Sequence, residues 1–549
     1  MMADPAPEFT SLTARRSKAP HFRPTEVEPV VGKDILELLS SAMYVDPRTV
    51  YREYIQNAAD SIDDAFGAGV LADSTLGRVD VWLDTEARNV RIRDNGTGLR
   101  VVDAERILTS FGASPKREKE ARGFRGVGRL SALGYAQVVS FRTKAAGEKK
   151  VTEVRWDCRR LKSALLDPSY HGDLRQLVRD VVTVLVEDHE DQSLHFFEVA
   201  LEKVVRIRND LLLNVEEISR YLSEVAPAPF RPDFPFAPAI LEQIRLHVPV
   251  CRFEMFINDS TEPVRRPHAE QFALSKAKSD SATAFELIEL SDGEGGLRAI
   301  GWLLHHSYLG AIHAATELRG LRARAGNIQI GTWEIFAEVF PEVRFNSWTI
   351  GEIHVLDRRI IPNARRDSFE QNAAFSSLLA QLVPIARDIT RRCRNSSARR
   401  NRIGAIEARE ARVLAALELL AQRGVSKARA NRTRRDVGAT LGEMKKLAAS
   451  SVLAETDRAR FSRKISTLQT RYHGLKATDL LVDPLESMPK TQRSAYRDVF
   501  DLIYDCSASK TVAKALVDRI TDRLAGQLGR TKQRRARGKK KRAKNNSAS

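Results

Sequence analysis

The stretch REYIQNAADSIDDA, residues 52–65, is predicted to form an amphipathic helix with an unusual polar stripe. At 3.6 residues per turn, Glu53, Asn57 and Asp60 fall within an arc of roughly 60°. The apolar residues lie beside this stripe: Ile55, Ala58, Ala59 and Ile62. A solvated helix face is the simpler explanation of an acid, an amide and a second acid on one side. A site for a polar ligand is the alternative, and the rest of the sequence decides between them.

The composition indicates a globular protein of several domains. A chain of 549 residues is too long for one core and favours about three domains. Hydrophobic residues make up 42% and charged residues 29%, both ordinary values. No apolar run approaches roughly 18 residues, so we expect no membrane span, and the N-terminus lacks the apolar segment of a signal peptide. The four cysteines are far apart, which argues against a disulfide framework or zinc site and favours a reducing compartment.

The net charge of +18 is concentrated at the C-terminus. Residues 530–549 contain ten lysines and arginines and no acid, and removing those ten leaves +8. We expect this tail to be disordered and to offer at most non-specific attraction to nucleic acid or another acidic surface.

The pattern along the chain predicts an α+β protein with a helical C-terminal region. Helical spacing over 33–66, with an N-cap at Asp46, precedes a hairpin of alternating strands over 78–84 and 89–95. Further strands and a helix over 214–225 follow without regular βαβ spacing. The expected divisions are a flexible arm (1–32), a first α/β domain (33–225), a Pro-rich linker (226–239), a second α/β domain (240–372), a helical region (373–528) and the basic tail (529–549).

Three short motifs occur in a characteristic order. The helix carries Glu53-x-x-x-Asn57-x-x-Asp60, a strand then ends in the sequence DNGTG (94–98), and a loop ends in GFRGVG (123–128). Together they resemble the GHKL ATPase superfamily of gyrase-type topoisomerases, heat-shock protein 90 chaperones, histidine kinases and MutL. No GxxxxGK[ST] is present, so a P-loop is excluded. The resemblance implies a Bergerat-type ATP-binding α/β sandwich for 33–225 and, more loosely, a middle (transducer) domain for 240–372.

The resemblance also implies roles for the motif residues. Asn57 would bind Mg²⁺ together with the phosphates of ATP, because magnesium prefers oxygen ligands. Glu53 would orient and deprotonate the attacking water, and Asp60 would lie nearer the nucleoside. Asp94 would accept a hydrogen bond from the adenine amino group, while Gly96 and Gly98 let the backbone approach the base.

The glycine-rich loop would form a mobile lid over the triphosphate. We expect it to end at the N-terminus of a helix over 129–136, whose free amides and dipole suit phosphate. Its predicted ATP contacts are Ser114, Lys116, Gly123, Gly126, Val127 and Gly128. An ordinary surface hinge is the competing explanation.

A second catalytic group is predicted in the second α/β domain. The sequence PNARRD (362–367) resembles the heat-shock protein 90 middle-segment loop, in which an asparagine precedes the catalytic arginine by three residues. Arg366 would then contact the γ-phosphate and Asn363 would steady the loop. Arg365 is the alternative to Arg366, and a charged surface turn is the alternative to both.

The resemblance favours an ATP-driven clamp of heat-shock protein 90 type, a homodimer with an unidentified protein client. Glu53 favours an ATPase over a histidine kinase. The family's Gly-Thr pair on a late strand is absent, with only Ser193 nearby, and the basic tail and helical region are unlike a standard chaperone. The alternative is a MORC- or MutL-like clamp acting on nucleic acid. We expect a cytoplasmic protein, or a nuclear one in a eukaryote.

Overall fold

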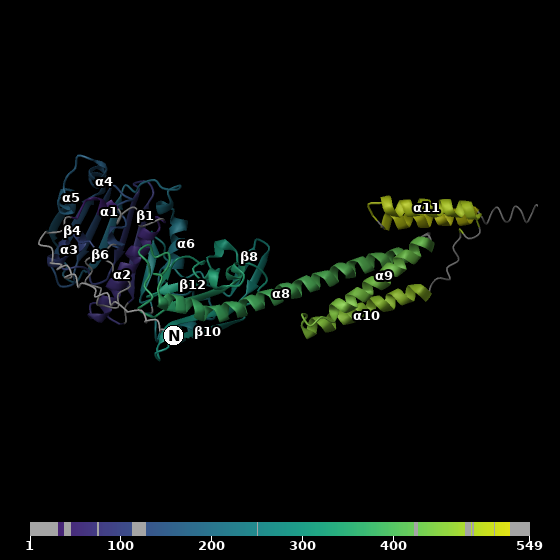
Figure 1. The fold of residues 1–549 in the computed structure, drawn as a ribbon. Helices are drawn as coiled ribbons and strands as arrows, with labels where there is room; N and C mark the ends of the chain where they lie inside the picture. The colour runs from purple at the N-terminus through teal and green to yellow at the C-terminus, as the bar shows by residue number, and fades with distance from the viewer. Residues whose placement is uncertain are drawn as a thin grey trace, which may run out of the picture.

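The computed structural model describes residues 31–37, 46–73, 76–111, 128–249, 251–421, 427–477, 485, 488–509 and 511–527. Two α/β bodies lie side by side, and a long helix leads from the second body to a group of helices (Figure 1). The mixed α/β class and the helical C-terminal region are therefore confirmed. Most of the predicted N-terminal arm and the basic tail lie outside the described residues.

The first sheet has seven strands in the order β5-β4-β3-β6-β2-β1-β7. Its strands are β1 (Gly77–Asp84), β2 (Asn89–Asp94), β3 (Val138–Lys144), β4 (Lys150–Asp157), β5 (Val182–Asp188), β6 (Phe196–Glu202) and β7 (Phe253–Ile257). All neighbouring pairs are antiparallel except β1 and β7. Alternate residues of β1 are buried, as the period of two predicts for a sheet covered on one face.

Helices cover the buried face of this sheet and form one core with it. They are α1 (Asp34–Glu37), α2 (Thr49–Gly67), α3 (Val101–Thr109), α4 (Cys158–Leu166), α5 (Leu174–Val181) and α6 (Val215–Val225). Helix α2 begins at Thr49, and the Asp46 side chain accepts a hydrogen bond from the Arg48 N–H rather than from within the helix. Ile55 and Ile62 of α2 are fully buried against the strands.

The second body is built around a five-stranded sheet in the order β10-β11-β14-β12-β13. It contains α7 (Ala237–Ile244), β8 (Gln271–Ser275), β9 (Lys278–Ser281), β10 (Ala284–Ser291), β11 (Leu297–His305), β12 (Gly320–Ala325), β13 (Ile328–Ile330) and β14 (Ile350–Val355). Although β7 lies in the range expected for the second domain, it pairs with β1 of the first sheet. The two bodies therefore do not meet at one point in the chain: α7 packs in the core of the second body, and the chain then returns to the first core from β7 to Val264.

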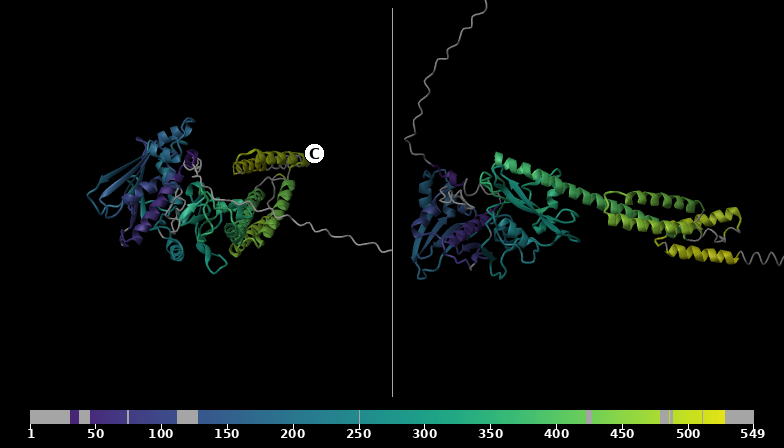
Figure 2. Two further views of the ribbon diagram at one scale, coloured as in Figure 1. Left: turned by 60° about the vertical axis from the view of Figure 1, so that its left-hand side comes forward. Right: turned by 90° about the horizontal axis from the view of Figure 1, so that it is seen from below.

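The C-terminal helices form an arm that extends away from both sheets (Figure 2). Helix α8 (Ala373–Leu420) has 48 residues, packs its first half on the second body and continues into a three-helix bundle with α9 (Lys427–Ala448) and α10 (Glu455–Ala477). Helix α11 (Lys490–Cys506) and a helix over 511–527 form a separate small core. No described helix is long and apolar enough to cross a membrane.

Candidate active site

The polar stripe of α2 is not a solvated face. Glu53 and Asp60 are each only 5% exposed, and Asn57 is half-buried between them. Burying carboxylates costs free energy unless charge or hydrogen bonds compensate. The simpler explanation offered by the helix alone is therefore wrong, and the stripe is part of an interior polar site.

The DNGTG motif lies at the end of β2 and packs against α2. Asp94 is buried, and one of its carboxylate oxygens (Oδ1) accepts a hydrogen bond from the Gly96 N–H at 2.9 Å. A Cβ on Gly96 would lie 2.1 Å from the Ser61 hydroxyl oxygen, and Thr97 N–H donates to the Ser61 carbonyl at 3.2 Å. Glycine is needed at position 96 because the turn touches the helix backbone.

Gly98 is constrained in a different way. Its φ of +63° lies in the left-handed region, and a Cβ there would come within 2.1 Å of the Lys144 carbonyl oxygen. The turn that carries Asp94 is therefore held between α2 and the end of β3.

The last glycine of the GFRGVG motif lies beside Glu53. A Cβ on Gly128 would be 2.3 Å from Glu53 Oε2. The other predicted lid contacts, Ser114, Lys116, Gly123, Gly126 and Val127, lie outside the described residues.

The helix expected over 129–136 is wrong. Only one 3₁₀ turn forms (Gly128–Leu130), followed by i→i+3 bonds from Leu133 to Leu130 and from Tyr135 to Ala132. Gly134 disfavours a longer helix, because glycine in a helix interior costs about 1 kcal/mol relative to alanine. A single helical turn has only a small dipole. The predicted contribution of a helix dipole to phosphate binding at this position is therefore not supported.

One helix thus brings the three motifs together. Gly128 touches α2 at Glu53, and Gly96 touches it at Ser61. Eight residues of helix correspond to about 12 Å. Asn57 and Asp60 occupy the helix between these two contacts.

The second α/β body contributes a basic side chain to the same place. Arg366 Nε lies 3.0 Å from Glu53 Oε1, and the Arg366 side chain is only 12% exposed. Arg365 is exposed. Asn363 bridges the loop, because its amide nitrogen donates to Asp367 Oδ1 at 2.6 Å and its amide oxygen accepts from the Asp367 N–H at 3.2 Å.

Arg52 is a further site residue that pattern analysis missed. Its guanidinium donates to the carbonyl oxygens of Arg365 at 3.1 Å and Arg366 at 3.3 Å, and its Nε is 3.7 Å from Glu53 Oε1. The partners are more than 300 residues away in the chain, so no local signal could have revealed the contact.

The described residues could bind Mg²⁺ only together with ligands from outside the protein, such as water and phosphate oxygens. Among the described residues no group of three or more His, Cys, Asp or Glu could hold a metal ion. The half-buried Asn57 could supply one oxygen ligand to Mg²⁺, which usually keeps several waters and takes one or two protein ligands.

His195 lies close to Ser193, near the position where the GHKL family usually has a Gly-Thr pair. Ser193 is exposed and donates to Asp191, so it does not approach the site. His195 instead hydrogen-bonds the Gly96 carbonyl oxygen through Nδ1 at 2.7 Å. This contact was not predicted.

Comparison with known proteins agrees with this geometry. Residues 47–171 match the family model described as "Histidine kinase-, DNA gyrase B-, and HSP90-like ATPase". Residues 47–171 are thus similar to a GHKL-type ATPase domain. The match spans α2, the Asp94 turn and Gly128, which are the elements that meet in the structure.

The curated relatives include a bacterial chaperone. "Chaperone protein HtpG" of Escherichia coli strain K12 and that of Escherichia coli O157:H7 are each 33% identical over 142 residues. The matched segment covers 23% of this chain and 23% of each relative. The chain therefore matches under a quarter of the length of these relatives.

Proposed function

We propose that this protein is a Mg²⁺-dependent ATPase that works as an ATP-driven clamp of heat-shock protein 90 type. ATP would bind along α2, with adenine at Asp94 and the triphosphate between Asn57 and Gly128. The Bergerat-type sandwich would be the nucleotide domain, and the second body would be the transducer. The observation that carries the proposal is the ion pair between Glu53 and Arg366, which unites two predicted catalytic groups from separate bodies.

The surroundings of Glu53, Asn57 and Asp94 suit the role proposed for each of them. Glu53 would orient the attacking water and accept its proton. Mg²⁺, when bound, would neutralise phosphate charge, and Asn57 would supply its protein ligand. Asp94 is buried at the end of β2, so a guanine in place of adenine would leave its carboxylate without the expected donor.

Arg366 would have one role before ATP binds and another when ATP is bound. Without nucleotide it neutralises the buried Glu53 carboxylate. When ATP is bound, the γ-phosphate would attract the guanidinium and free Glu53 to accept a proton. An arginine in this role can contribute about 10³-fold or more to phosphoryl transfer.

ATP hydrolysis by wild type and by two variants tests the proposal. Arg366→Ala should lower the kcat for ATP hydrolysis by about 10³-fold while ATP affinity stays close to that of wild type. Arg365→Ala is the matched control and should retain activity, because Arg365 is exposed. Loss of activity in Arg365→Ala instead would assign the role to the neighbouring residue, and no ATP hydrolysis by wild type would refute the proposal.

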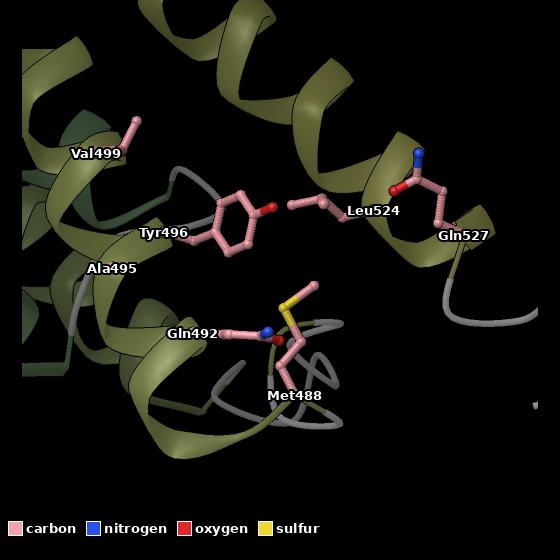
Figure 3. Close-up of a pocket in the computed structure, with 7 residues that line it drawn as sticks. All are labelled: Met488, Gln492, Ala495, Tyr496, Val499, Leu524 and Gln527. Atoms are coloured by element: carbon pink, nitrogen blue, oxygen red, sulfur yellow. The ribbon is translucent and has the colours of Figure 1, made fainter. Parts of the chain in front are cut away.

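We place a homodimer contact on the helical hairpin of α11 and 511–527. This hairpin exposes apolar side chains, with Leu502 61% and Val512 63% exposed. It also borders an open pocket of about 400 Å³ (Figure 3), lined by Met488, Gln492, Ala495, Tyr496, Val499, Leu524 and Gln527. Light scattering should give twice the chain mass for wild type and a single-chain mass for Leu502→Glu; a monomeric wild type would contradict the dimer.

The charge of the arm favours one alternative substrate, nucleic acid. Helices α8, α9 and α10 contain 22 lysines and arginines against 8 acidic residues. Arg432 and Arg435 are exposed one helical turn apart on α9, and neither makes an ion pair within the described chain. Gel-shift binding of duplex DNA that weakens steeply with salt, and is reduced by Arg432→Glu with Arg435→Glu, would support this alternative. No binding at about 50 mM salt would remove it.

A further inference from the structure

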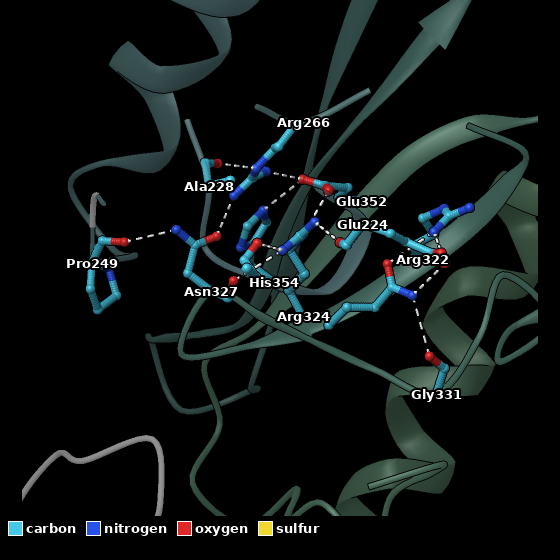
Figure 4. A network of polar contacts seen from close by, with 12 residues as sticks. Glu224, Ala228, Pro249, Arg266, Arg322, Arg324, Asn327, Gly331, Glu352 and His354 are labelled. Atoms are coloured by element: carbon cyan, nitrogen blue, oxygen red, sulfur yellow. Dashed lines mark hydrogen bonds and ion pairs between the residues drawn. The ribbon is translucent and has the colours of Figure 1, made fainter. Parts of the chain in front are cut away.

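A buried polar network joins the two α/β bodies (Figure 4). At its centre Glu352 of β14 is fully buried and accepts hydrogen bonds from Arg266 and Arg324, both at 2.6 Å. Burial alone would raise the pKa of the Glu352 carboxyl, but the two guanidinium groups hold it well below its usual value. The carboxylate is therefore charged, paired and fixed in place.

The same arginines bind the chain segment that leaves the nucleotide domain. Arg324 donates to the carbonyl oxygens of Glu224 at 2.7 Å and Ala226 at 3.1 Å, and Arg266 donates to that of Ala228 at 2.7 Å. These acceptors form the end of α6 and the residues after it. The orientation of α6 is thus tied to the second sheet.

Gln329 extends this network to the arginine loop, the segment 362–367 that carries Arg366. Its amide nitrogen donates to Glu224 Oε1 at 3.0 Å and to the Gly331 carbonyl oxygen at 3.3 Å, and its amide oxygen accepts from Arg322 at 3.0 Å. The side chain is only 1% exposed. Both of its amide N–H groups donate, and its amide oxygen accepts one hydrogen bond, so the side chain is held between α6 and residue 331.

Gly331 then contacts the loop directly. Its N–H donates to the Arg366 carbonyl oxygen at 2.9 Å. Its φ is +66°, and a Cβ would lie 2.6 Å from the Asp367 carbonyl oxygen, so only glycine fits. A continuous set of bonds therefore runs from Glu224 through Gln329 and Gly331 to Arg366.

We propose that Gln329 is a positioning residue that holds Arg366 in register with Glu53 according to the orientation of α6. The inference rests on the proposed catalytic function of Arg366. Gln329 touches no reacting group itself; it fixes Gly331, whose N–H fixes the backbone of Arg366. A shift of the nucleotide domain against the second sheet is transmitted through Glu224 to the arginine that completes the site.

The test combines a substitution with a double-mutant comparison. Gln329→Met keeps the length of the side chain but removes its hydrogen bonds, and should lower kcat by about tenfold with KM for ATP unchanged. In an Arg366→Ala background the same substitution should have no further effect, because Gln329 acts through Arg366. Gln381→Met is the matched control: Gln381 lies on α8, where its amide donates to the Ser291 carbonyl oxygen.

A second variant guards against misfolding. Gln329→Asn keeps the amide group but is one methylene shorter, so it cannot bridge Glu224 and Gly331 as Gln329 does, and should show the same loss of kcat. If Arg366→Ala impairs hydrolysis but neither Gln329 variant does, the positioning role is wrong. Equal loss from Gln329→Met with and without Arg366 would also overturn it. Wild-type turnover in Arg366→Ala would remove the role of Arg366, and that of Gln329 with it.

Discussion

Replacing Gly128 by alanine should slow ATP hydrolysis sharply while leaving the fold intact. The new Cβ would lie 2.3 Å from Glu53 Oε2, whereas ordinary contacts begin at 3.4 Å, so the carboxylate must retreat by about 1 Å. The cost to stability is small, because the displaced atom is the far end of a flexible side chain. A catalytic group misplaced by about 1 Å can lose about 100-fold in rate, and we expect a fall in kcat of that size.

The assay compares steady-state turnover with ATP affinity measured by calorimetry. Gly67→Ala is the control, since it lies at the end of the same helix and a Cβ there meets nothing within 4 Å. Gly67→Ala should retain full turnover. Gly128→Ala with the kcat of wild type would show that the Glu53 carboxylate is not the base at this position. Lost ATP binding with an intact fold would instead make Gly128 a phosphate contact.

Three further outcomes are expected. Glu53→Ala should bind ATP but not hydrolyse it, and turnover at the wild-type rate would exclude Glu53 as the base. Asp94→Asn should abolish ATP binding in calorimetry, because the amide presents a donor to the adenine amino group; unchanged affinity would contradict the adenine contact. Burial lowers the pKa of His268 to about 3, so the unfolded chain takes up a proton that the folded chain excludes as pH falls below about 6.5. In unfolding by urea, followed by tryptophan fluorescence, the loss of stability between pH 7 and pH 5 should be smaller in His268→Gln than in wild type by about 2 kcal/mol.

Local patterns predicted the part of the site that is close together in the chain. The stripe on α2 and the turn after β2 follow from helical spacing and from glycine chemistry, and both reappear as elements that touch each other. The expected hairpin of strands is confirmed as β1 and β2. Such elements depend on neighbours a few residues away, which a single sequence displays.

Contacts between distant segments could not be predicted in the same way. The parallel pairing of β1 with β7 joins Val79 to Met255, and neither strand carries a sign of its partner. The bonds from Arg52 to the arginine loop depend on how two separately folded bodies meet. The neighbours of Gln329 in the chain give no sign of its contacts, because these depend on its burial between Glu224 and Gly331.

Because helix α8 is long, a small tilt of the second body would displace the far end of this helix by a large distance. Its 48 residues span about 72 Å, with Leu378 and Leu382 anchored in the core of the second sheet and Leu417 in the bundle at the far end. A tilt of about 10° at the anchored end would sweep the distal end through about 12 Å. A small rearrangement around a bound nucleotide would thus be amplified by the long helix into a displacement of about 12 Å at its far end.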